Sequence, residues 1–225
     1  MGGGFANGNG VPINFFGIKD ISNAVVIMID VSDSMFTRTG DVHGRKLVRL
    51  GKEQAFRNVR DEAIKLVQSL KPQTRFDIIH WAGSAQAWKP QLVPATEANK
   101  AAAIAHIQDA IDYKSAKPGP GKPGGTRHDY ALKLAFSLKP ETIYMLTDGN
   151  ATAYHPKTGG LKSIPPEELY KIAAEGQTTL PKKAHLHTIY YLNAKEKKAE
   201  REMLLQLASR NGGQFKTVPA KVPNE

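Results

Sequence analysis

The stretch "AVVIMIDVSDSM", residues 24–35, decides the fold of this chain. Its six leading apolar residues are typical of a strand that is buried on both faces of a parallel sheet. The run ends at Asp30, and Ser32, Asp33 and Ser34 follow directly. In open α/β sheets the ligand site lies beyond the carboxyl ends of the strands. The stretch therefore predicts a buried parallel strand with a polar site at its carboxyl end.

The rest of the chain alternates between strand patterns and helix patterns. Alternation of this kind favours βαβ units, and hence an α/β fold of three layers with a mostly parallel central sheet and helices on both faces. Pro90 places one short strand at a sheet edge. We expect strands at 24–30, 75–81, 87–94, 142–149, 184–192 and 214–218, and helices at 51–70, 96–111, 126–138, 165–176 and 194–213.

Length and composition bound the class of protein. The 225 residues suffice for one domain, which we place at 20–218, after a flexible Gly/Asn-rich linker at 1–19 and before a tail at 219–225. The absence of cysteine excludes disulfides, thiolate metal ligands and cysteine nucleophiles. We find no signal peptide and no transmembrane segment, so the compartment is open, and an excised domain of a larger, membrane-anchored protein is compatible with the sequence.

Three separate pieces of sequence converge on the predicted carboxyl edge. They are Asp30-Val-Ser32-Asp33-Ser34, the Gly-Gly-Thr126 segment that opens a helix, and Thr-Asp148-Gly149 after a later strand. Together they offer only oxygen donors, which suit Mg²⁺, Mn²⁺ or Ca²⁺. The neutral hydroxyls favour a small octahedral ion that keeps some of its water.

These three pieces, in this order, resemble those of the von Willebrand factor A domain, and the bacterial members in particular. The resemblance covers residues 20 to 218 and implies a metal-ion-dependent adhesion site (MIDAS). It implies hydroxyl ligation by Ser32, Ser34 and Thr126, whereas Asp30 and Asp148 act largely through metal-bound water. Many members have glycine where this chain has Asp33. The remaining candidates, which would support or border the site, are Asp33, Arg127, His128 and Gly149.

Each piece also has a simpler structural interpretation. Asp30 and Ser32 could cap turns, and Asp148-Gly149 could be a turn dipeptide. Thr126 and Asp129 match a capping box for the following helix. We expect His128 to be a solvent-exposed helix residue.

Other sites fit the sequence less well. The Gly119–Gly124 segment matches a dinucleotide-binding pattern but follows no strand, and the P-loop lysine is replaced by Gly125. His185 and His187 share one strand face, and we interpret them as structural because no third ligand is near in sequence. The phosphatase motif is excluded because Ser32 replaces its second aspartate.

The net charge of +10 bears on the partner. An ion inside a basic rim favours a protein partner that supplies an Asp or Glu carboxylate, so we expect a cation-dependent binding module and not an enzyme. A nucleic-acid-binding module is the alternative, based on Arg45, Lys46, Arg49 and Lys52. The loops at 31–50, 114–127 and 149–163 contain only the acids Asp33 and Asp41. Against them stand ten cations: Arg38, Arg45, Lys46, Arg49, Lys114, Lys117, Lys122, Arg127, Lys157 and Lys162.

Overall fold

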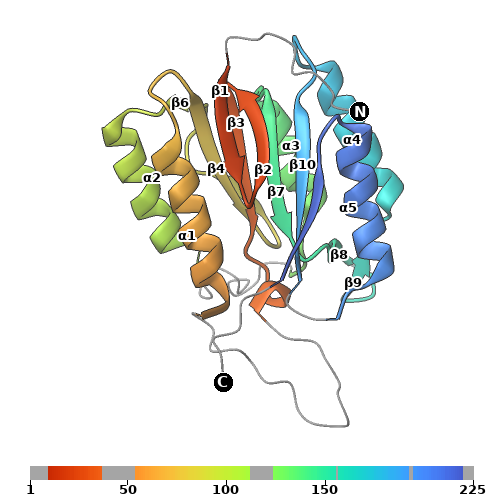
Figure 1. Cartoon of the computed structure of the whole chain (residues 1–225). Helices are drawn as coiled ribbons and strands as arrows, with labels where there is room; N and C mark the ends of the chain where they lie inside the picture. Colours follow the sequence, from red (N-terminus) through yellow and green to blue (C-terminus); the bar gives the residue numbers. More distant parts are fainter. Residues whose placement is uncertain (1–9, 37–53, 112–123, 156, 193–194, 220–225) are drawn as a thin grey trace.

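The computed structural model describes residues 10–36, 54–111, 124–155, 157–192 and 195–219. It confirms an α/β fold of three layers, with a central sheet between two groups of helices (Figure 1). The strands of this sheet are β3 (Ala24–Asp30), β4 (Arg75–Trp81), β5 (Ala85–Ala87), β6 (Val93–Pro94), β7 (Thr142–Thr147), β10 (His185–Leu192) and β11 (Phe215–Pro219). The helices are α1 (Gln54–Ser69), α2 (Glu97–Ala110), α3 (His128–Ser137), α4 (Pro166–Thr178) and α5 (Lys198–Arg210).

The central position of β3 explains its continuous apolar run. The strand order is β11-β10-β7-β3-β4-β5, with β6 also paired to β4, and only β5 and β6 are antiparallel. Because β3 has parallel partners on both sides and helices on both faces, all seven of its residues are buried. Val25 and Ile27 pack in the core beneath α1 and α2, while Val26 and Met28 pack in the core beneath α3, α4 and α5.

The parallel pairing of β3 and β7 places two aspartates at one edge of the sheet. Ile29 pairs with Leu146, so Asp30 at the end of β3 and Asp148 just beyond β7 leave the sheet together. A short 3-10 helix, η1 (Asp33–Phe36), turns the chain immediately after β3. This carboxyl edge lies at the bottom of Figure 1.

The predicted N-terminal linker is wrong from residue 11 onward. Strands β1 (Val11–Phe15) and β2 (Ile18–Ser22) form an antiparallel hairpin, and residues 1–9 lie outside the described part of the chain. Alternate residues of β1 are buried, so the segment is a strand with one apolar face. Its two-residue turn has positive φ at Phe16 and Gly17, as tight hairpins require.

Two further segments differ from the prediction. The single strand expected at 87–94 is instead two short strands, β5 and β6, and Pro90 lies in the connection between them. An unpredicted hairpin of β8 (Thr152–His155) and β9 (Gly160–Ser163) follows β7 at the carboxyl edge. Among the described ranges, no helix combines the length and apolarity needed to cross a membrane.

Candidate metal centre

We call Asp30, Ser32, Ser34, Thr126 and Asp148 the carboxyl-edge site. Asp30 is fully buried, and its Oδ1 accepts a hydrogen bond of 2.9 Å from the backbone N–H of Ser32. The hydroxyl oxygens of Ser32 and Ser34 lie 3.1 Å apart, and Ser34 in turn forms a hydrogen bond with the Asp148 carboxylate. The structure therefore links four of these five side chains in one continuous group.

The fold places two carboxyl groups close together in this site, where their negative charges repel each other. Burial and, to a smaller extent, the nearby charge of Asp148 raise the pKa of Asp30 to about 7. Burial also raises the pKa of Asp148, which is only 8% exposed. Paired, desolvated carboxylates favour proton uptake or a bound cation, because either reduces their repulsion. The set of carboxylate and hydroxyl donors fits a hard divalent ion.

Thr126 comes from a loop that pairs with the β8 strand. Its N–H donates to the Thr152 carbonyl at 3.0 Å, and its side chain is almost fully buried. The capping-box interpretation of Thr126 is wrong, because Arg127 occupies the N-cap position of α3 without any side-chain cap bond. The Asp129 carboxylate instead accepts a bond of 2.8 Å from Arg127 Nε. Helix capping therefore does not account for threonine at position 126.

His128 is completely buried, so the expectation of a solvent-exposed residue is wrong. Its Nδ1 lies 3.2 Å from the Thr126 carbonyl oxygen, and its Nε2 lies 3.1 Å from Thr147 Oγ1. Thr147 Oγ1 donates a bond of 2.6 Å to Asp30 Oδ2. Burial lowers the pKa of His128 to about 4, so the ring is neutral at pH 7. The imidazole thus lies between the loop that carries Thr126 and Thr147 of β7, whose hydroxyl bonds to Asp30.

Gly149 and Arg127 border the site in different ways. Gly149 has a φ of +80°, and a Cβ there would lie 2.8 Å from Cβ of Glu200 on α5. Its N–H also donates to Thr147 Oγ1 at 3.0 Å. Arg127 forms an ion pair with Asp129 and lies over the ring of Tyr130 at 3.3 Å, so its charge is already partly balanced.

Three residues near the site were not among the predicted site residues, although Thr147 belongs to one of the three quoted pieces of sequence. Thr147 precedes Asp148 directly, and its position at the end of a buried strand was the available signal. Lys197 lies close enough to Asp148 to lower its pKa, and it forms an ion pair of 2.8 Å with Glu200. No local pattern connects these two residues to a site 49 or more positions earlier in the chain, because α5 brings them there only through its packing on β10.

The predicted basic rim lies mostly outside the described residues. Arg127, Lys157 and Lys162 are described, as is Asp33, which is exposed at the start of η1. The other members of the rim, and Lys52 of the nucleic-acid alternative, have no described position: Arg38, Asp41, Arg45, Lys46, Arg49, Lys114, Lys117 and Lys122.

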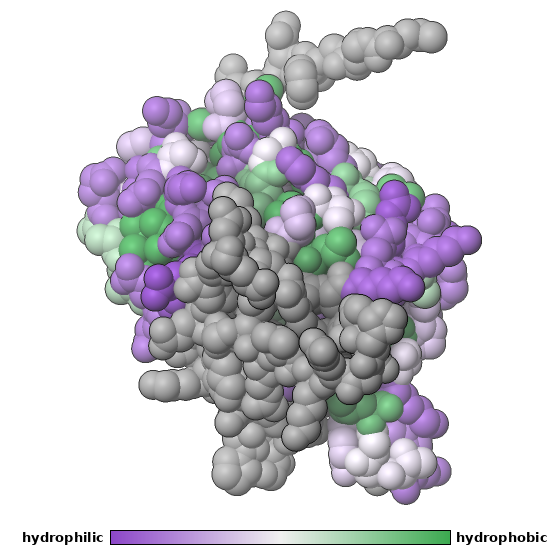
Figure 2. Space-filling model, turned by 60° about the horizontal axis from the view of Figure 1, so that its bottom comes forward, coloured by the Kyte–Doolittle hydropathy of each residue, from purple (hydrophilic) through white to green (hydrophobic). Residues whose placement is uncertain are grey.

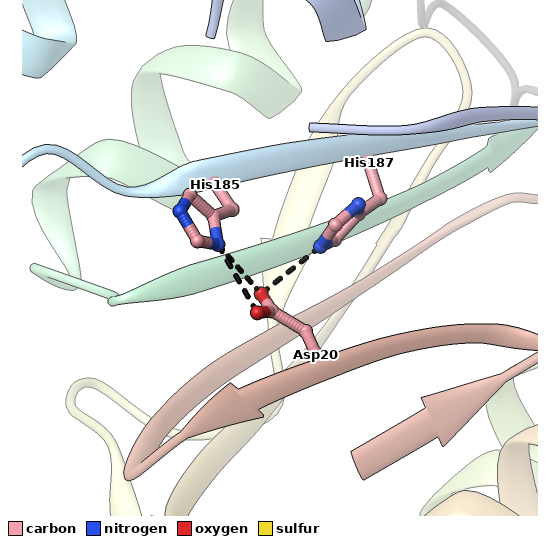
Figure 3. Close-up of side chains that lie close together, drawn as sticks. All are labelled: Asp20, His185 and His187. Atoms are coloured by element: carbon pink, nitrogen blue, oxygen red, sulfur yellow. Dashed lines mark hydrogen bonds and ion pairs between the residues drawn. The ribbon is translucent and has the colours of Figure 1, made fainter. Parts of the chain in front are cut away.

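A second polar cluster lies near the start of β10, and we call Asp20, His185 and His187 the amino-edge cluster (Figure 3). Asp20 Oδ2 lies 2.9 Å from His185 Nδ1 and 3.0 Å from His187 Nε2. By spacing alone, these three groups could hold a metal ion. The third potential ligand was missed in the sequence because Asp20 precedes His185 by 165 positions.

The hydrogen bonds of His187 oppose metal binding at the amino-edge cluster. The Gln214 N–H donates to His187 Nδ1 at 2.9 Å, so the ring proton resides on Nε2 and is donated to Asp20. A metal at Nε2 would require this imidazole to lose its remaining proton. Burial alone would raise the pKa of Asp20, but bonds from His187, Thr142 and His185 outweigh it and hold that pKa well below its usual range. The cluster is therefore a satisfied structural network.

The sequence is similar to part of several curated proteins. No family model matches the chain. Among curated proteins, it is 29% identical over 167 residues to inter-alpha-trypsin inhibitor heavy chain H4 from Bos taurus, and 31% identical over 159 residues to heavy chain H3 from the same species. These alignments cover 67% and 64% of this chain but only 15% of each relative. The chain therefore corresponds to a small part of those proteins.

Solved structures give the same fold. A von Willebrand factor type A protein from Catenulispora acidiphila matches with a TM-score of 0.58 at 18% identity, over 89% of this chain and 40% of that one. The PilB minor pilin from Streptococcus sanguinis matches with a TM-score of 0.61 at 14% identity, over 88% and 57%. Proximal thread matrix protein 1 from the mussel byssus, with a zinc-occupied MIDAS motif, matches with a TM-score of 0.53 at 16% identity, over 93% and 46%. This chain has the von Willebrand factor type A fold.

Proposed function

We propose that this chain, a von Willebrand factor A fold, is a binding module in which the carboxyl-edge site holds a divalent cation and the cation binds a protein partner. The observation that carries the proposal is the pair of buried carboxylates, Asp30 and Asp148, joined to two serine hydroxyls at the edge where β3 and β7 end. A cation would relieve the repulsion that this arrangement creates.

The residues fit the roles that such an ion requires. Ser32, Ser34 and Thr126 would supply neutral hydroxyl ligands, and Asp30 and Asp148 would hold the hydroxyls and the water bound to the ion. A site with so few charged ligands leaves positive charge on Mg²⁺, Mn²⁺ or Ca²⁺ and leaves positions for an external oxygen. An Asp or Glu carboxylate of the partner protein is the ligand we propose there. The mussel protein of the same fold has a MIDAS motif occupied by zinc, which supports the proposal of metal binding by this chain.

Titration with Mn²⁺, followed by loss of the free-ion EPR signal, tests the ion. We expect one saturable site that Mg²⁺ displaces and that Ser32→Ala weakens at least about tenfold, because a direct ligand is lost. His185→Ala is the matched control, because it removes a ligand-type side chain from the amino-edge cluster instead. Equal Mn²⁺ affinity in the native protein and Ser32→Ala, or a loss in His185→Ala, would contradict the assignment.

Chelation and salt separate the two kinds of partner. Binding through a metal-bound carboxylate should disappear in EDTA. Binding of nucleic acid should survive EDTA and weaken steeply with salt, because it releases counterions. Retention of a bound oligonucleotide in EDTA would favour the nucleic-acid alternative.

A further inference from the structure

The β8–β9 hairpin is joined directly to the loop that carries Thr126. Thr126 and Thr152 exchange two backbone hydrogen bonds, each 3.0 Å long. Thr152 Oγ1 also accepts from the Thr126 N–H at 3.0 Å. The position of the hairpin beside the carboxyl-edge site is therefore fixed by the same residue that we propose as a ligand.

The strand register shows which face of the hairpin adjoins the site. Side chains alternate along a strand, so Thr152 and Tyr154 lie on one face, and the register pairs Tyr154 directly with Leu161. Thr152 Oγ1 accepts a hydrogen bond from the backbone N–H of Thr126, so this face of β8 lies against the loop that carries Thr126. A Cβ built at Gly125 would lie 3.3 Å from Leu161 Cδ2, which places Leu161 against the loop next to Thr126.

Large apolar side chains are exposed at this edge. Tyr154 is 43% exposed and Leu161 is 56% exposed, and Tyr130, four residues after Thr126, is 45% exposed. Within the described ranges, the only other exposed large apolar residue is Ile21, on β2. Figure 2 brings the carboxyl edge forward and shows hydrophobic atoms on the projection at its lower right, where the hairpin lies.

We infer that Tyr154 and Leu161 form a docking surface for an apolar side chain adjacent to the acidic residue of the partner. The inference rests on the proposed function, because the metal-bound carboxylate would fix the partner beside the hairpin. Lys157 lies in the turn of the same hairpin and its charge complements an acidic segment, whereas Lys162 pairs with Ala153 on the opposite face. A rigid pair of cross-strand apolar residues can bury a side chain with little loss of conformational entropy.

Selection from a phage-displayed library of random peptides tests the inference. The protein is immobilised in Mg²⁺ and bound phage are eluted with EDTA. We expect enrichment of peptides in which Asp or Glu lies within two positions of Leu, Ile, Phe, Tyr or Trp. A target with Tyr154→Ser and Leu161→Ser should retain the acidic preference and lose the apolar one.

A synthetic copy of the most enriched peptide then gives the size of the effect. We expect the double substitution to weaken its binding about tenfold, because apolar contact area is lost, while Mn²⁺ affinity stays unchanged. Ile21→Ser, which removes an exposed apolar residue far from the site, is the matched control and should bind as the native protein does.

The possible failures are distinguishable. Enrichment of acidic peptides without an apolar neighbour would overturn the inference and leave the proposed function intact. Absence of any EDTA-eluted acidic peptide would overturn the proposed function and the inference together. Self-association that the double substitution abolishes would assign the hairpin surface to a second copy of this chain and overturn the inference.

Discussion

Two aspartates are buried at opposite ends of the parallel strands of the central sheet, and the two carboxylates have opposite surroundings. Asp20, at the amino edge, accepts hydrogen bonds from Ile21, Thr142, His185 and His187. Asp30, at the carboxyl edge, has the carboxylate of Asp148 as its charged neighbour. These hydrogen bonds lower the pKa of Asp20, whereas burial and then the charge of Asp148 raise the pKa of Asp30 to about 7.

This difference separates a structural carboxylate from the carboxylates that we propose hold a cation. Donors of the protein already satisfy Asp20, so a cation there would have to displace protons that the fold places. At Asp30 and Asp148 the fold brings together negative charge that an external cation can stabilise. Titratable side chains that lie close together therefore indicate a metal site only after each proton has been assigned.

Removal of the satisfied carboxylate should have the largest effect. In Asp20→Ala, the buried donors of His187 and Thr142 lose their acceptor. Each donor left without an acceptor costs about 1–3 kcal/mol of stability. We expect the free energy of unfolding in urea to fall by about 3 kcal/mol. Mn²⁺ affinity of the folded fraction should not change, and a parallel loss of Mn²⁺ binding would mean that the amino-edge cluster is itself the metal site.

The buried imidazole of His128 should affect the affinity for the metal although it is not a proposed ligand. His128→Leu removes the connection between the Thr126 loop and Thr147, so we expect Mn²⁺ affinity to fall about 10- to 100-fold, as for other supporting hydrogen bonds at metal sites. Thr147→Ser keeps the hydroxyl that bonds to Asp30 and is the matched control. Native Mn²⁺ affinity in His128→Leu, measured by the same EPR titration, would show that this ring only fills space.

The stability that the Asp20 carboxylate contributes should depend on pH. The folded-state pKa of Asp20 is lowered, so its contribution is complete above the unfolded pKa of about 4 and is lost as the pH falls. Asp20→Asn should therefore be about 2 kcal/mol less stable than the native protein at pH 6, and this gap should narrow below about pH 4. Urea unfolding at pH 6, 4 and 3 measures it, and a constant gap would contradict the role of the charge.

Substitution at the proposed metal site should change stability in the opposite direction. Asp148→Asn removes one of two buried, repelling acids, so the metal-free protein should gain about 1 kcal/mol of stability or stay unchanged. The same variant should lose the stabilisation that Mg²⁺ gives to the native protein. Thermal unfolding in EDTA and in Mg²⁺ distinguishes these effects, and a metal-free protein destabilised by more than about 1 kcal/mol would contradict the comparison.

Much of the fold could be predicted because it depends on local patterns. The buried run of β3, the helical spacing of α1 and the acids that follow the apolar runs of β3 and β7 are all visible over a few residues. The linker interpretation of residues 11–19 was wrong because glycine and asparagine nearby obscured the alternation of β1. The β8–β9 hairpin was missed because Leu161 and Tyr154 are exposed and give no apolar period.

The sequence by itself determined the parallel sheet, the edge at which the polar residues gather and the chemistry of their donors, because strand periodicity and residue type act over short distances. Only the tertiary structure decided that His128 lies beneath the site, that Asp20 meets His187, and that α5 brings Lys197 beside Asp148. Each of these contacts joins separate elements, and the packing of the whole core fixes them. The same packing determines the proton positions that distinguish the two aspartate clusters.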